Sequence, residues 1–167
     1  MKILYFHQHF STPNGSTGTR SYEFAKKLIK SGNSVTMVCG SYWIAESGVS
    51  TPFKNGKRTG IVDGIKVIEL DLNYSNNINF FKRSIIFLKY SLRGLKISLT
   101  EDYQVLFATS TPLTAGIPGI FAKIFRKKHF IFEVRDLWPE LPKALGVIKN
   151  PILLYLMNIL ESITYYF

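Results

Sequence analysis

Charged residues cluster at the end of one predicted strand. Residues 129–134 form an apolar run typical of a buried strand. The charged residues that close or follow the run are Glu133, Arg135, Asp136 and Glu140. In an open α/β sheet the ligand crevice lies beyond the carboxyl ends of the strands, and a carboxylate there can bind a substrate hydroxyl or accept its proton. The competing interpretation is structural, with Arg135 paired to a carboxylate and Trp138 in the core.

A small-residue loop follows a second predicted strand, residues 2–7. The loop contains Gly15, Ser16, Thr17 and Gly18, and a predicted helix begins near Thr19. Small residues let the backbone approach a ligand closely, and a helix N-terminus offers N–H groups to a phosphate. Arg20 can add a bidentate contact. The spacing matches neither the Walker pattern nor the dinucleotide fingerprint, and a plain turn is the competing interpretation.

Three hydroxyl residues follow a third predicted strand, residues 103–108. They are Thr109, Ser110 and Thr111, and they precede a predicted helix over 113–126. Their hydroxyls can bind a polar ligand, or Ser110 or Thr111 can cap the helix.

Metal and thiol chemistry are not indicated. His7 and His9 lack cysteine or carboxylate neighbours at metal-ligand spacing, so we interpret both as core or crevice residues. Cys39 is the single cysteine and is predicted to be a small buried hydrophobe. We therefore expect no metal site and no cofactor.

Positive charge gathers on a predicted helix over residues 78–99. The chain carries a formal net charge of +10, which favours an anionic partner. A basic helix with bulky apolar residues resembles an interfacial membrane anchor, although it can equally be an ordinary helix with solvated lysines. Phe80, Phe81 and Phe87 are the candidates to enter a membrane. The candidate membrane residues are Phe80, Phe81, Lys82, Arg83, Lys89, Arg93 and Lys96.

The predicted elements define the fold class. Strands are predicted at 2–7, 34–39, 64–70, 103–108 and 129–134, helices at 19–30, 78–99, 113–126 and from Pro151 to the end, and a mobile loop at 41–60. This alternation predicts an α/β fold: a single Rossmann-like domain with an open parallel sheet and helices on both faces. The loops 8–20, 109–116 and 135–142 should meet at one edge, because each follows a strand. No signal peptide or spanning segment is evident.

Several of these segments together resemble family-4 retaining glycosyltransferases. The matching runs are His7 to Phe10, Gly18 to Ala25, Ala108 to Gly116 and Phe132 to Glu140. The last two are similar to the branch that builds O-antigen, capsule and other bacterial surface polysaccharides. The resemblance covers essentially the whole chain, so residues 1–167 resemble one N-terminal domain, half of a GT-B fold, with the C-terminal donor domain absent.

The resemblance implies an acceptor-side domain. Such a domain serves transfer of a sugar from a nucleotide-sugar donor to a lipid-linked or polysaccharide acceptor, without a metal. Gly15 to Gly18 would lie near the donor diphosphate, and Asp136 near the reacting sugar with Arg135 and Glu140 close by. Without a donor domain we expect the chain to be inactive alone, so whether it is itself an enzyme stays open.

Two other classes of function compete with this one. The first is a non-catalytic module that binds membrane or acceptor, left from a truncated enzyme. The second is nucleic-acid binding, which the charge alone prompts and no recognised motif supports. We expect an anionic membrane surface rather than nucleic acid as partner, and a cytoplasmic protein that is peripheral on the inner face of the cell membrane.

Overall fold

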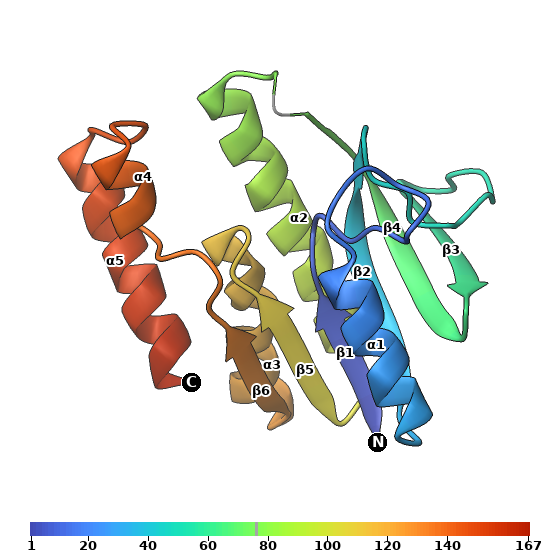
Figure 1. The fold of residues 1–167 in the computed structure, drawn as a ribbon. Coiled ribbons are helices and arrows are strands. Elements are labelled where there is room, and N and C mark those ends of the chain that lie inside the picture. Colours follow the sequence, from blue (N-terminus) through green and yellow to red (C-terminus); the bar gives the residue numbers. More distant parts are fainter. Residues whose placement is uncertain (76) are drawn as a thin grey trace.

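The computed structural model describes residues 1–75 and 77–167 as a six-stranded sheet with helices on both faces (Figure 1). The strand order is β3-β4-β2-β1-β5-β6, and every neighbouring pair is parallel except β3 and β4. The strands are β1 (Lys2–Phe6), β2 (Ser34–Tyr42), β3 (Lys57–Val62), β4 (Ile65–Tyr74), β5 (Val105–Thr109) and β6 (His129–Glu133). The predicted α/β class with a Rossmann-like arrangement is confirmed.

The helices divide between the two faces of the sheet. Figure 1 shows α1 on one face, with α2 and α3 on the other and α5 beside α3. The helices are α1 (Arg20–Lys30), α2 (Phe80–Thr100), α3 (Ile117–Arg126), α4 (Glu140–Ala144) and α5 (Pro151–Tyr166), and a short 3₁₀ turn, η1 (Leu113–Gly116), precedes α3. Pro118 therefore stands in the first turn of α3, where its missing N–H costs no intrahelical bond.

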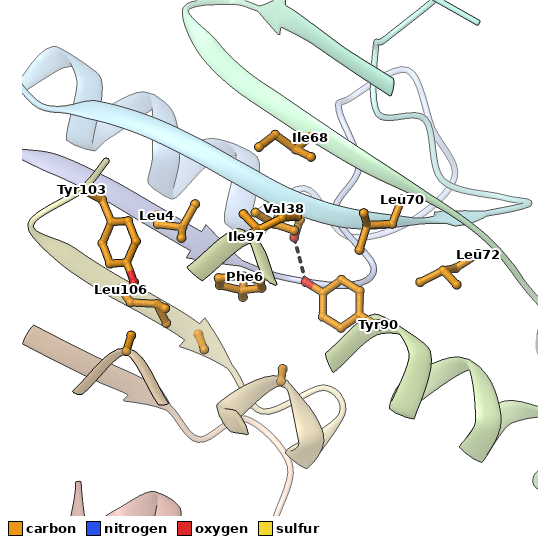
Figure 2. Packing of buried hydrophobic residues seen from close by; sticks show 13 residues of the cluster. Leu4, Phe6, Val38, Ile68, Leu70, Leu72, Tyr90, Ile97, Tyr103 and Leu106 are labelled. Atoms are coloured by element: carbon orange, nitrogen blue, oxygen red, sulfur yellow. Dashed lines mark hydrogen bonds between the residues drawn. The ribbon is translucent and has the colours of Figure 1, made fainter. Parts of the chain in front are cut away.

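Two buried clusters sandwich the sheet because side chains alternate along each strand. In β1, Leu4 and Phe6 pack toward α2, whereas Ile3 and Tyr5 pack toward α1. Figure 2 shows the cluster on the α2 face, where the Tyr90 hydroxyl donates to the Val38 carbonyl at 2.7 Å. This bond satisfies a phenol that is 0% exposed. Cys39 is also fully buried, as predicted.

The prediction of one loop over 41–60 is wrong. Residues 57–62 form β3, which pairs antiparallel with β4 at one side of the sheet. The hairpin turn is Asp63–Gly64, and both residues have positive φ, at 49° and 85°. Asp-Gly is a strong hairpin signal, so β3 was recognisable from the turn that follows it. The helix α4 was also missed, and its five residues are too few to show a period.

Candidate functional site at the carboxyl edge of the sheet

The three predicted loops meet at one edge. The strands β1, β5 and β6 are adjacent and parallel, so their carboxyl ends lie together. Side-chain contacts join these segments: Arg20 forms an ion pair with Glu133, and the Thr111 hydroxyl donates to Asp136 Oδ2 at 3.0 Å. The prediction that Arg20 and Asp136 lie at the same end of the sheet is confirmed.

Glu133 is the centre of the first contact. Its carboxylate accepts hydrogen bonds from the Arg20 guanidinium and from the Thr109 hydroxyl, the latter at 2.9 Å. The bond from Arg20, aided by Thr109, holds the pKa of Glu133 below its usual value. Arg20 thus has a protein partner in this structure. The pair that ties the loops is Arg20–Glu133, rather than the Arg135 pair considered from the sequence.

Ser110 holds the loop that carries Asp136. Its hydroxyl oxygen accepts from the backbone N–H of Arg135 at 2.7 Å and from that of Asp136 at 3.2 Å. Ser110 is 1% exposed, so these bonds are shielded from water. In the described residues Ser110 does not cap a helix, which rules out that interpretation. Asp136 is left half-buried, and Arg135 is exposed with no ion pair among residues 1–75 and 77–167.

The glycine loop divides into a packed part and an open part. The N–H of Gly15 donates to the Thr12 carbonyl and that of Ser16 donates to the Ile44 carbonyl, so neither is free for a phosphate. A Cβ on Gly15 would lie 2.6 Å from the Glu46 nitrogen, which explains the glycine by packing. A Cβ on Gly18 would meet nothing within 4 Å. Gly18 is therefore the open position of this loop, whereas the hydroxyl oxygen of its neighbour Thr17 is buried.

Residues directly after β1 hold buried polar atoms without partners. The side-chain nitrogen and oxygen of Gln8, Nδ1 of His9 and Oγ1 of Thr17 have no hydrogen-bond partner in the described part of the chain. Gln8 is 0% exposed, and a buried amide without partners is costly. The sequence analysis singled out His7 and His9 but missed Gln8, which lies between them. These atoms give the edge a set of unused donors and acceptors.

His7 and His9 are both neutral at physiological pH. Burial lowers the pKa of His7 to about 3, with smaller contributions from His9 and Arg135. Burial and the Arg135 charge lower the pKa of His9 to about 4. His7 Nδ1 shares a hydrogen bond of 2.7 Å with the Ser21 hydroxyl, which anchors β1 to α1. The His9 ring lies against Tyr42, Tyr74 and Phe87. Both are crevice residues, as predicted.

The remaining candidates lie outside this group. Glu140 begins α4 and is exposed, and it forms no ion pair within residues 1–75 and 77–167. No cluster of three or more His, Cys, Asp or Glu residues that could hold a metal ion is present within residues 1–75 and 77–167. The site is therefore built from one half-buried carboxylate, one free guanidinium and unpartnered neutral polar groups.

The comparisons with known proteins show the fold. No protein-family model matches the chain, and none of the curated proteins matches it. A solved structure described as "Trehalose-6-phosphate from E. coli bound with UDP-2-fluoro glucose" is similar, with a TM-score of 0.52 and 12% identity over 88% of this chain. The match covers 36% of that protein, a GT-B glycosyltransferase. The chain thus has the fold of one Rossmann-like half of a GT-B enzyme.

Replacing Glu133→Gln should destabilise the protein by about 1 kcal/mol or less at neutral pH, because the pair with Arg20 is partly exposed. The pKa of Glu133 is lower in the folded protein than in the unfolded chain, so its ionised form stabilises the fold. That stabilisation is present above the pKa of the unfolded carboxyl and is lost as the pH falls through the folded-state pKa. The difference between wild type and variant, measured by urea unfolding, should therefore shrink in acid. The control Lys27→Gln, beside the pair, should leave the free energy of unfolding unchanged. A difference that is constant in acid contradicts this assignment.

Proposed function

We propose that the chain is the acceptor-side domain of a glycosyltransferase. The reaction is transfer of a sugar from a nucleotide-sugar to a lipid-linked or polysaccharide acceptor, of the kind used in O-antigen or capsule synthesis. The observation that carries the proposal is the meeting of the three loops at the carboxyl edge, where Thr111 holds Asp136. The GT-B likeness supports sugar transfer as the general class.

The edge residues suit a sugar and a phosphate. Asp136 can accept a hydrogen bond from a sugar hydroxyl, and the bond from Thr111 fixes its orientation. Arg135 is exposed and unpaired in the described residues, so its guanidinium is available to a phosphate. Gly18 lies on the open part of the glycine loop, where a ligand can approach its backbone closely. In this proposal Asp136 is the candidate catalytic residue, and the others bind substrate.

UDP-glucose tests the phosphate contacts of this proposal, because the glycine loop and Arg135 are the residues it assigns to the donor diphosphate. We expect isothermal titration calorimetry to detect weak binding, and Arg135→Gln to weaken it about tenfold, because a charge-assisted hydrogen bond contributes about 1.5–3 kcal/mol. Lys57→Gln, at the far side of the sheet, removes the same charge and should have no effect. We expect no sugar transfer by the 167 residues alone. Equal effects of the two variants, or robust transfer, would overturn the proposal.

The outer face of α2 supports docking on an anionic membrane. Its exposed apolar residues are Phe81, Ile85, Leu88, Leu92 and Leu99. At 100° per residue these form one row, and Lys82, Lys89 and Lys96 form a second row beside it. An apolar row bordered by lysines is the pattern of an interfacial helix. No helix in the described residues is both long and apolar enough to span a bilayer.

The structure changes which of the predicted residues can serve this surface. Of the three phenylalanines, Phe81 is 72% exposed, whereas Phe87 stacks on Tyr74 at 5.6 Å and Phe80 is half-buried. Of the three, Phe81 is therefore the residue best placed to enter a membrane. Arg93 donates to the carbonyls of Gly56 and Asp71, both at 3.1 Å, so it also holds the β3 hairpin.

Vesicle sedimentation tests the membrane surface. The protein should bind vesicles of phosphatidylglycerol and phosphatidylcholine, and binding should weaken with salt. Replacing Lys82, Lys89 and Lys96 by Gln should lower the affinity by up to about 100-fold, at about 1 kcal/mol for each lysine. The matched control replaces Lys27, Lys30 and Lys54, which are exposed and lie outside α2. If both triple variants bind alike, the α2 face is not the docking surface.

A further inference from the structure

An apolar groove lies between α2 and α5. Phe80 and Phe87 line it from α2, Leu113 from η1, and Ile148, Met157 and Leu160 from α5 and the residues before it. Its volume is about 130 Å³, and the lining residues that the structure describes carry no charge. The hydroxyls of the lining residues Ser84 and Thr114 already donate to backbone carbonyls.

One polar group in the lining is unused. Trp138 lines the groove, and its indole N–H is buried without an acceptor among the described residues. A buried indole N–H ordinarily finds a partner, so this donor is available to an oxygen of a ligand. The groove therefore combines an apolar lining with a single donor.

The groove borders the polar edge described above. Thr111, which holds Asp136, immediately precedes the lining residue Pro112. Phe87 lines the groove and also lies 6.5 Å from the His9 ring, measured between ring centroids. A ligand that fills both spaces must have an apolar part next to a polar, phosphate-like part.

The size of the groove selects the apolar part. A helix of a partner protein is about 10–12 Å across and cannot enter. A single hydrocarbon chain is narrow enough, and the lysine row on α2 complements an anionic headgroup.

We propose that the groove binds one hydrocarbon chain of a phosphorylated lipid, with the headgroup at the carboxyl edge and Trp138 donating to an oxygen between them. This inference rests on the proposed function, since it makes the lipid-linked acceptor the ligand of this domain. The outer face of α2 docks on the membrane, and the groove withdraws one chain from it.

Fluorescence of Trp138 with dodecyl phosphate tests the groove. Trp43→Phe removes the exposed second tryptophan, so Trp138 alone reports. Titration below the micelle concentration should give a saturable change, a weaker one with dodecanol and none with inorganic phosphate. Ser84→Phe and Met157→Phe fill the groove and should each weaken binding about tenfold or more. Ile61→Phe, at an exposed position on β3 outside the groove and the α2 face, should not.

Two results would overturn the proposal: no saturable change with dodecyl phosphate, or equal binding by the groove-filling variants and Ile61→Phe. Circular dichroism shows whether each groove-filling variant folds. Dodecyl phosphate binding by either variant that folds is enough to decide the question. The groove and the wider function fail separately. Ser84→Phe leaves Arg135 intact. If the wild-type protein binds dodecyl phosphate but not UDP-glucose, the result counts against the sugar site alone.

Discussion

The candidate site depends on the contacts of one carboxylate, that of Glu133. It ends β6, accepts from Thr109 at the end of β5, and pairs with Arg20 at the start of α1. Three segments that are far apart in the sequence are thereby fixed at one edge. Because its pKa is held below the usual value, the carboxylate keeps its charge, and Arg20 keeps its partner, further into acid than an ordinary glutamate would. Ser110 then holds the backbone of the following loop, and Thr111 holds the Asp136 side chain at the carboxyl edge.

Local sequence patterns predicted most of the sheet. The apolar runs at 34–39 and 129–134 correspond to β2 and β6, and the rule for parallel sheets then placed their loops at one edge. The strand β3 was missed because Gly60 and alternating exposed residues hide its period, although the Asp63–Gly64 turn was informative. Long-range pairing could not be predicted: Arg20 and Glu133 are 113 residues apart, and neither carries a local sign of its partner.

The two faces of α2 show what periodicity can add. Phe80 and Phe81 were grouped as membrane residues, although successive residues of a helix point in directions 100° apart. The structure accordingly puts Phe80 in the groove and Phe81 in solvent. The same helix thus separates three environments: the core at Tyr90, the groove at Phe80 and the outer lysine row at Lys89. A polar edge next to an apolar groove is an arrangement suited to an amphiphilic ligand.

Amide chemical-shift mapping with UDP-glucose tests the central claim, that the carboxyl edge is the ligand site. The account predicts shifts that cluster at residues 8–9, 17–18 and 135–136, which come from separate segments and meet only at this edge. A second basic cavity, lined by Lys54, Lys57 and Arg58, offers an internal comparison. Shifts confined to that cavity, with the carboxyl edge unchanged, would contradict the account.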